Sequence, residues 1–342
     1  MLNFIRKRIN VVKNFSETSK MLCGNRKIID FLLTKYILGV PIEEYLNLGF
    51  YNKPWNVRKQ YLYNDDPLFR IYNPDVNFDS EDDKIDLYYK TKDFMRRKII
   101  TNKNLSLEDF KKFTEGLCSF FYKPADSYGG KGIQKIYLDK DIDLLELYNE
   151  IIKLPEGLLE ETVIQHEMLN HLCPNLLQTI RFGVFKHKDG PKILFATLKT
   201  SMSKDAFVDN ATSGGIFANI NLETGRIQTN AYRFLNFNTQ EDVEQFGIKV
   251  FDEEGLAVHP ITGVVFKGFE IPYFEEAKKL VLDISSQNDF YNRRLLGIDI
   301  AISEKGPDLI EVNTTRPGMT HLWQVACKSM PVKPVLDKML KE

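Results

Sequence analysis

Two acidic residues near the end of the chain have the spacing expected of a metal site. Residues 297–302 and 309–313 alternate polar and apolar side chains and flank a turn-forming stretch, a pattern typical of a β-hairpin. A symmetric hairpin centred on Lys305 places Asp299 directly opposite Glu311, so that both side chains point to one face. Because like charges that oppose each other destabilise a sheet, this pair predicts a cation between the two carboxylates.

The predicted cation is a hard divalent ion. Asn313 shares the face of Glu311 and adds an amide oxygen to the two carboxylates. Oxygen ligands of this kind favour Mg²⁺ over Zn²⁺. The alternative is a solvent-exposed hairpin face whose acidic side chains bind no ion.

A glycine-rich segment between two predicted strands is a candidate phosphate-binding loop. Gly129, Gly130 and Gly132 would let the backbone approach an anion closely and turn successive N–H groups toward it. Lys123 and Lys131 add positive charge on either side. The segment lacks the ending of a Walker A loop, and a strand instead of a helix follows it. A glycine-rich hairpin turn without a ligand is the alternative.

A second candidate nucleotide contact follows about thirty residues later. An apolar strand leads into Glu160 and Glu161, and backbone groups at such a strand end can meet the edge of a base. Glu167 would accept hydrogen bonds from ribose hydroxyls, as acidic residues do in other nucleotide sites. The alternative is a strand that ends in surface glutamates.

A zinc site is not expected from the histidines. His166 and His171 are five residues apart, whereas the zinc-protease motif needs two histidines four residues apart on one helix face. The other three histidines, His187, His259 and His321, have no ligand spacing.

Composition excludes several classes of protein. The 342 residues are 43% hydrophobic and 27% charged, which is typical of a globular protein with one large or two ordinary domains. The formal net charge of -1 gives no electrostatic reason to expect a nucleic-acid partner. The four cysteines lack CxxC spacing and no signal peptide is apparent, so we expect a cytoplasmic protein.

A transmembrane helix is not expected, because no uncharged apolar run approaches roughly 18 residues. Residues 1–30 hold seven Lys or Arg against two acids, with apolar residues between them. A basic amphipathic helix there would make peripheral contact with an anionic membrane. An ordinary surface helix packed on the domain is the favoured alternative.

The chain divides near residue 95. A helical pattern, an acidic turn-rich stretch over 64–86 and a change of charge sign over 90–98 predict a mainly helical N-terminal region, 1–95. Helices and strands then follow without strict βαβ alternation, which favours an α+β fold with antiparallel sheets. The expected helices are 28–38, one capped by Ser106, 141–153 and 274–287, and the expected strands are 119–123, 133–138, 158–165, 179–185 and 192–198.

The candidate nucleotide and metal residues resemble those of the ATP-grasp superfamily and follow one another in the same order. They are Lys123, the loop 129–132, Glu160 with Glu167, and Asp299 with Glu311 and Asn313. Residues 178–181, 208–216, 259–263 and 268–272 add to the resemblance, which covers about residues 45–335. The closer similarity is to the sugar-transfer-associated ATP-grasp branch, related to teichuronopeptide-type ligase-like proteins of cell-surface polysaccharide loci. One departure is that the basic residue before the phosphate-binding strand has three candidates, Arg96, Arg97 and Lys98.

The resemblance implies an ATP-grasp domain over residues 96–338, with two α+β subdomains whose antiparallel sheets clasp ATP. The ATP-binding subdomain would span about 96–168, and the metal and substrate subdomain about 169–338. The nucleotide-binding residues would be Lys123, Gly129, Gly130, Lys131, Gly132, Glu160, Glu161, Val163 and Glu167. The ligands of one or two Mg²⁺ ions, with Mn²⁺ as an alternative, would be Asp299, Glu311 and Asn313.

The resemblance also implies residues at the reacting groups. Arg181, Lys131 and Arg316 would be catalytic, and Asp209 and Asn210 would lie near the acceptor substrate. Alternatives stay open for four of these positions. Asp209 and Asn210 also suit a simple turn. Arg181 also suits a surface cation on its strand, and Arg316 also suits an ion pair within its loop.

The activity implied is ATP- and Mg²⁺-dependent ligation of a carboxylate to an amine through an acyl phosphate. The substrates would be small molecules, such as an amino acid with a sugar or a peptide, in cell-surface polysaccharide or peptide modification. One alternative is a phosphotransferase on the same scaffold. Another is a non-catalytic nucleotide-binding partner of a glycosyltransferase system. The sequence carries no indication of the oligomeric state.

Overall fold

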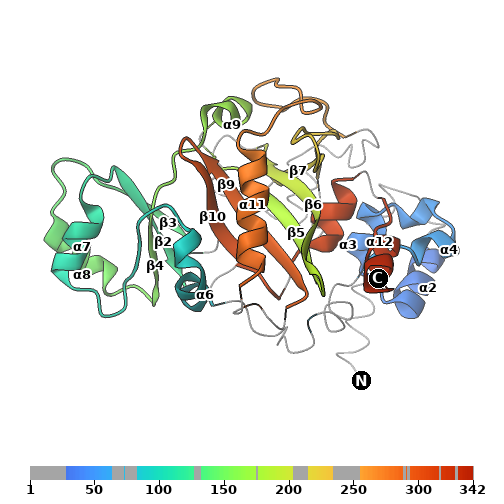
Figure 1. Ribbon diagram of the computed structural model, residues 1–342, viewed down its shortest axis with the longest axis horizontal. Coiled ribbons are helices and arrows are strands. Elements are labelled where there is room, and N and C mark those ends of the chain that lie inside the picture. The colour runs from blue at the N-terminus through green and yellow to red at the C-terminus, as the bar shows by residue number, and fades with distance from the viewer. Residues whose placement is uncertain are drawn as a thin grey trace.

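Two antiparallel sheets form the frame of the molecule and lie next to each other (Figure 1). The computed structural model describes residues 28–63, 73, 83–126, 132–174, 176–202, 215–233, 255–287, 290, 293–315, 317–327 and 330–341. Every pair of neighbouring strands in the two sheets is antiparallel. The expected α+β class with antiparallel sheets is therefore confirmed.

The smaller sheet has four strands in the order β1-β4-β2-β3. Its strands are β1 (Ile99–Thr101), β2 (Ser119–Pro124), β3 (Gln134–Tyr137) and β4 (Gly157–Glu161). Two helices, α7 (Leu107–Thr114) and α8 (Leu144–Ile151), cover one face. Phe120, Tyr122 and Leu159 join the core beneath these helices. Because side chains alternate along a strand, Lys123 and Glu160 lie on the opposite face.

The start of α7 follows the capping expected from its sequence. The Ser106 hydroxyl accepts a hydrogen bond from the Asp109 backbone N–H (3.0 Å) and lies 2.6 Å from the Asp109 carboxylate. Such a cap satisfies one of the free N–H groups of the first turn.

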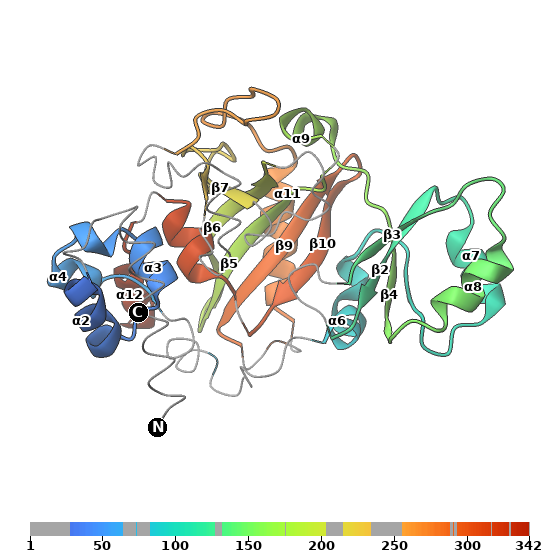
Figure 2. The same ribbon diagram turned by 180° about the vertical axis from the view of Figure 1, so that it is seen from behind.

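The larger sheet has six strands in the order β10-β9-β5-β6-β7-β8. Its strands are β5 (Thr179–His187), β6 (Gly190–Ser201), β7 (Gly215–Ile220), β8 (Tyr232–Arg233), β9 (Leu295–Ser303) and β10 (Gly306–Asn313). The helix α11 (Phe274–Ser285) packs on one face over a continuous apolar core (Figure 1). Figure 2 shows the other face, with β10 at the edge nearest the smaller sheet.

Short helical segments lead into and out of the smaller sheet. The helices α6 (Lys84–Thr91) and η3 (Lys92–Phe94) precede β1, and α9 (Glu167–Leu172) follows β4. The Tyr88 hydroxyl donates to the Ile99 backbone oxygen (3.0 Å), which ties α6 to the smaller sheet. Although α6 lies within the N-terminal region predicted from sequence, it packs beside β4. The boundary at residue 95 stays a prediction.

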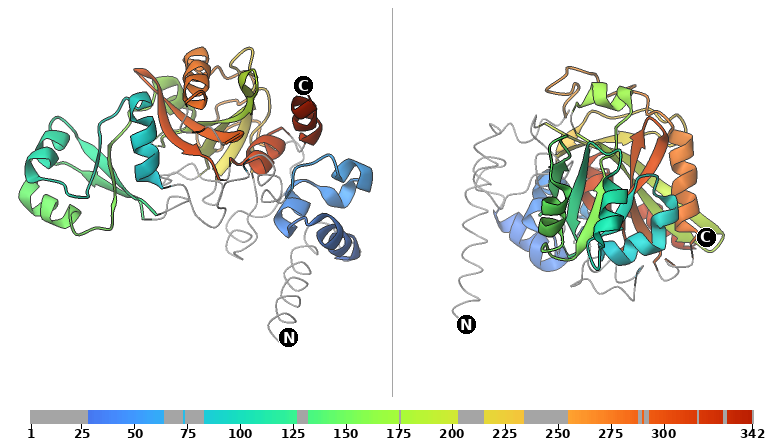
Figure 3. Two further views of the ribbon diagram at one scale, coloured as in Figure 1. Left: turned by 60° about the horizontal axis from the view of Figure 1, so that its bottom comes forward. Right: turned by 90° about the vertical axis from the view of Figure 1, so that its left-hand side faces the viewer.

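The N-terminal helices lie at the opposite end of the molecule from the smaller sheet, next to the C-terminal helix (Figure 3). They are α2 (Ile28–Leu38), α3 (Ile42–Asn47), η2 (Phe50–Asn52) and α4 (Trp55–Arg58), and the C-terminal elements are the π-helical η6 (Thr320–Val325) and α12 (Lys333–Lys341). Buried aromatic residues of the N-terminal helices share one apolar cluster with Val325 of η6. None of the helices in the described residues is long and apolar enough to cross a membrane.

A buried side chain joins the N-terminal region to η6. The Gln324 amide donates to the Leu62 backbone oxygen (2.7 Å) and accepts from the Leu62 backbone N–H (2.8 Å). Gln324 is fully buried, so its removal leaves two backbone groups without partners.

We predict that Gln324→Ala lowers the free energy of unfolding by about 2–3 kcal/mol, because two buried backbone groups lose their hydrogen bonds. Urea denaturation followed by circular dichroism measures this change. Gln60→Ala is the matched control, since Gln60 is exposed and its substitution is expected to change stability by less than about 0.5 kcal/mol. Equal effects of the two substitutions would contradict the prediction.

Candidate active site

A row of charged side chains, two acidic and one basic, crosses three strands on the face of the larger sheet opposite α11. Glu311 on β10 pairs with Asp299 on β9, which pairs in turn with Arg181 on β5. The Arg181 guanidinium binds both carboxylate oxygens of Asp299, at 2.7 and 2.8 Å. Lys199 on β6 also binds Asp299, with its Nζ 3.1 Å from Oδ2. We call Glu311, Asp299 and Arg181 the acidic row.

The β9–β10 hairpin is not symmetric about Lys305, so that part of the sequence-based expectation is wrong. Ser303 pairs with Gly306 across a two-residue turn, and the register shifts between Leu309 and Glu311. Ile310 therefore forms a β-bulge. The opposition of Asp299 and Glu311 is nevertheless confirmed.

The bulge decides which side chains share the polar face. Asp308 pairs with Ala301 before the shift, and Glu311 pairs with Asp299 after it. Ala301 and Asp299 are two residues apart on β9, so both pairs point to the same side. A regular strand would instead have put Asp308 and Glu311 on opposite faces, because they are three residues apart.

Asp299 is held in its ionised form. Burial alone would raise its pKa, but the charges of Arg181 and Lys199 outweigh burial and lower the pKa to about 2. The loop after β10 completes the surroundings of Arg181, whose Nη1 donates to the Pro317 oxygen (2.9 Å). Gly318 adopts a φ of +74°, and a Cβ at this position would lie 2.8 Å from the same Nη1.

Glu311 is in the opposite electrostatic state. Burial and the nearby charge of Asp299 raise its pKa above the usual value. No residue in the described parts of the chain donates a hydrogen bond to its carboxylate or forms an ion pair with it. Asn313, which shares this face, donates its amide N–H to the Gly297 oxygen (3.3 Å).

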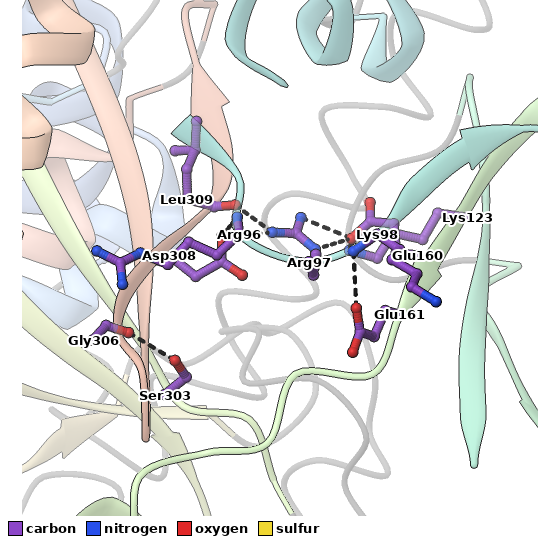
Figure 4. Close-up of polar contacts among 10 residues, drawn as sticks. All are labelled: Arg96, Arg97, Lys98, Lys123, Glu160, Glu161, Ser303, Gly306, Asp308 and Leu309. Carbon is purple, nitrogen blue, oxygen red and sulfur yellow. Dashed lines mark hydrogen bonds and ion pairs between the residues drawn. The ribbon is translucent and has the colours of Figure 1, made fainter. Parts of the chain in front are cut away.

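A second charged group joins the two sheets (Figure 4). Glu160 on β4 is buried, and its Oε2 lies 2.8 Å from Lys123 Nζ and 2.9 Å from Arg97 Nε. Burial would raise the pKa of Glu160, but the charges of Arg97 and Lys123 lower it to about 2. Arg97 reaches across to β10, with Nη1 3.2 Å from Asp308 Oδ1 and 2.6 Å from the Leu309 oxygen. We call Arg97, Lys123, Glu160 and Asp308 the inter-sheet cluster.

Sequence comparison identifies the family. The sequence model of sugar-transfer associated ATP-grasp proteins matches residues 64–338. The chain belongs to this ATP-grasp family. No curated protein matches the sequence significantly.

The chain is also similar to solved structures of low sequence identity. D-alanyl-alanine synthetase A from Vibrio cholerae is 15% identical over 76% of this chain and 64% of its own, with a TM-score of 0.43. ATP-grasp ligase PsnB with its minimal precursor is 14% identical over 79% of this chain and 63% of its own, with a TM-score of 0.43. N5-carboxyaminoimidazole synthetase from Staphylococcus aureus is 12% identical over 71% of this chain and 46% of its own, with a TM-score of 0.38. The chain thus spans less than two thirds of each protein, and the family assignment rests on the sequence model.

Several residues implied by the ATP-grasp resemblance lie along the segment from β4 to α9. Glu161 ends β4, and its carboxylate accepts from the Lys98 backbone N–H (2.9 Å). Val163 is half-buried in the connection that follows. Glu167 is exposed at the first residue of α9, and its backbone N–H donates to Glu304 Oε1 (2.7 Å).

Other expected site residues lie outside the described part of the chain. In the glycine loop this applies to Gly129, Gly130 and Lys131, whereas Gly132 is described, with a φ of +72°. The expected acceptor-binding and catalytic residues Asp209, Asn210 and Arg316 also fall outside it. The roles of these residues stay predictions.

Three charged residues of the ATP-grasp domain were missed or left ambiguous by the sequence. Lys199 lies one residue beyond the end of its predicted strand, but β6 continues to Ser201. Arg97 is one of three basic candidates, and in the described part of the chain it alone of the three binds the Glu160 carboxylate. Ile99 pairs with Glu160, so the two side chains share one face of the sheet. Arg97 is two residues before Ile99, so alternation along the strand places it on that face once the pairing is known. The sequence predicts Asp308 to lie in the turn, but it lies on β10.

The oxygen atoms on this face suit a hard cation in part. The Glu311 carboxylate accepts no hydrogen bond from the described residues. The Asn313 amide N–H binds the Gly297 oxygen, so the Asn313 side-chain oxygen remains available to a metal. The Asp299 carboxylate is already bound by two cations, Arg181 and Lys199. Among the described residues, no group of three or more His, Cys, Asp or Glu side chains forms a metal site. The predicted trio contains only two carboxylates, so it falls outside such a group.

We predict opposite effects of neutralising the two opposed acids in the ligand-free protein at pH 7. Asp299→Asn removes the buried carboxylate that binds both Arg181 and Lys199 and is expected to lower the free energy of unfolding by roughly 3 kcal/mol. Glu311→Gln removes a carboxyl group whose ionisation is disfavoured by burial and by Asp299, and it is expected to raise the free energy of unfolding by about 1 kcal/mol. Denaturant titration of both variants measures these changes.

The pH dependence supplies the control. The folded pKa of Glu311 is raised, so its ionisation destabilises the fold as pH rises through that value, and the advantage of Glu311→Gln should vanish in acid. The folded pKa of Asp299 is lowered to about 2, so its contribution is present at neutral pH and is lost as pH falls toward 2. Two losses of stability at pH 7 would contradict the assignment.

Proposed function

We propose that this protein is an ATP- and Mg²⁺-dependent ligase that joins a carboxylate to an amine through an acyl phosphate. The observation that carries the proposal is that β10 takes part in both charged groups. Its Asp308 belongs to the inter-sheet cluster, and its Glu311 belongs to the acidic row. The cations of the inter-sheet cluster suit phosphate, and the carboxylates of the acidic row suit a metal. The strand β10 links these two groups. Membership of the ATP-grasp family supports this arrangement.

The proposed nucleotide site is formed by the inter-sheet cluster and by the segment after β4. Lys123 would bind phosphate, because its side chain is 18% exposed at the end of β2 whereas that of Arg97 is 3% exposed. Backbone groups from Glu160 to Val163 would meet the adenine, since the Glu160 carboxylate is already bound to cations. Glu167 would bind the ribose. The glycine loop with Lys131 would close over the phosphates and exclude water.

The proposed metal site is on the acidic row. Glu311 and Asn313 would hold Mg²⁺ first, and Asp299 would join when phosphate attracts its cationic partners. When bound, the metal would neutralise negative charge on the phosphates of ATP. A cation beside Glu311 would also relieve the unfavourable burial of its carboxylate.

The proposed reaction requires two anions to meet. A substrate carboxylate oxygen attacks the γ-phosphorus of ATP, the bond from that phosphorus to the β-phosphate oxygen breaks, and ADP leaves. Arg181 and Lys199 would offset the repulsion between the anions, since both lie on the polar face of the larger sheet. An amine then attacks the acyl carbon, phosphate leaves, and the nitrogen loses a proton. Positioning of the reactants supplies much of the remaining acceleration.

The proposed substrates are a small carboxylate and an amine of cell-surface polysaccharide or peptide modification, such as an amino acid with a sugar or a peptide. The association of the family with sugar transfer supports this class.

Mass spectrometry of the products separates the ligase from a phosphotransferase. A product that lacks one water relative to its two substrates indicates ligation, whereas a substrate that gains one phosphate indicates phosphotransfer.

We predict that Glu311→Ala lowers acceptor-stimulated ADP release at least about a hundredfold. The proposed metal site then loses the carboxylate that accepts no hydrogen bond from the described residues. A coupled assay of ADP formation with candidate carboxylates and amines measures this loss. Glu270→Ala is the control, since Glu270 forms an exposed ion pair with Arg226 and should leave turnover intact. Turnover of the Glu311 variant at the wild-type rate would overturn the proposed function. Nucleotide binding without turnover on any acceptor would favour the non-catalytic partner.

A further inference from the structure

Asp308 is a buried acid that none of the proposed binding roles uses. Its side chain is 3% exposed on β10. Its Oδ1 accepts from the Arg96 backbone N–H (2.9 Å) and from Arg97 Nη1 (3.2 Å) (Figure 4). A residue of the larger sheet thus binds both the backbone and a side chain of the segment that leads into the smaller sheet.

The contacts continue from Asp308 to the proposed phosphate-binding lysine. Arg97 bridges Asp308 and Glu160, and Glu160 in turn binds Lys123. Every member of this series is at least four-fifths buried. The cluster contains two cations and two carboxylates, so its charges balance. The direction of Lys123 therefore depends on a series of contacts that begins at Asp308.

The hairpin that carries Asp308 also contacts the segment that leads out of the smaller sheet after β4. The His166 backbone N–H donates to the Ile302 oxygen (2.9 Å), and Gln165 pairs with Ser303. The Glu304 carboxylate accepts from the Glu167 backbone N–H (2.7 Å). Both connections to the smaller sheet are thus hydrogen-bonded to the β9–β10 hairpin, which also carries Asp299 and Glu311.

We propose that Asp308 is a positioning residue for nucleotide binding. By accepting from Arg96 and Arg97, it fixes the segment that enters the smaller sheet and sets Lys123 against the carboxylates of the larger sheet. This inference rests on the proposed function, in which Lys123 binds a phosphate. A phosphate bound between the two sheets requires their relative orientation, and misplacement by a fraction of an ångström weakens charged hydrogen bonds.

The test separates hydrogen bonding from charge. Asp308→Asn removes the negative charge but keeps an oxygen that accepts from Arg96 and Arg97. Asp308→Ala removes both the charge and the acceptor. Any change in electrostatic attraction of phosphate is common to the two variants, so their difference reports positioning. Calorimetry with Mg²⁺ and a non-hydrolysable ATP analogue should give affinity about ten times weaker for Asp308→Ala than for Asp308→Asn.

Hydrogen exchange of the ligand-free protein supplies a readout that needs no nucleotide. Amides of residues 96–100 should exchange faster in Asp308→Ala than in the wild type, and Asp308→Asn should restore their protection. Glu270→Ala serves as the control for loss of an exposed carboxylate. If the alanine variant does not fold, Asp308→Val replaces it, because valine also lacks an acceptor and suits a strand.

The outcomes distinguish this inference from the ligase proposal. Equal affinity and equal exchange in the alanine and asparagine variants, with normal binding by the wild type, overturn the role of Asp308 alone. Tighter nucleotide binding by Asp308→Ala also overturns it, since Asp308 would then compete with phosphate. Absence of nucleotide binding by the wild type overturns both proposals.

Discussion

The neutralisation of buried carboxylates on the polar face of the larger sheet constrains the rest of the structure. Asp299 is 2% exposed, and two cations from neighbouring strands keep it ionised. An unpaired charge at this depth would cost several kcal/mol. A one-residue slip of β9 would turn Asp299 into the apolar core beneath α11 and turn Ile300 outward. The register of β5, β6 and β9 is therefore fixed by charge on one face and by apolar packing on the other.

Local periodicity predicted most of the frame and one feature of the site. The helix expected over 28–38 coincides with α2, and Ser106 caps α7 as its spacing indicates. The opposition of Asp299 and Glu311 was also predicted, although a two-residue turn and the bulge at Ile310 produce it in place of a hairpin symmetric about Lys305. These features depend on residues that are close in sequence, where propensity, capping and period two act directly.

The remaining site residues depend on contacts between distant segments. β1 has only three residues, too few for a periodic pattern, so the choice of Arg97 among its neighbours needed the pairing with β4. The bulge at Ile310 has no pattern in the sequence, yet it brings Asp308 to the face of Glu311. Lys199 was missed because the length of β6 is set by its pairing with β5 and β7. Strand length, bulges and contacts between sheets are tertiary properties that local patterns do not specify.

The electrostatic states of the buried acids divide structural from binding roles. Asp299 and Glu160 each have two cationic partners and a pKa of about 2, so their charges stabilise the fold without a ligand. Glu311 has a raised pKa and no described hydrogen-bond donor, so its ionisation is unfavourable until another cation arrives. Protein stability alone gives no reason to place such a residue opposite another carboxylate. In the proposed function, a cation that accompanies a polyphosphate would resolve this conflict, because it would balance Glu311 while the phosphates would offer new acceptors to Arg181 and Lys199.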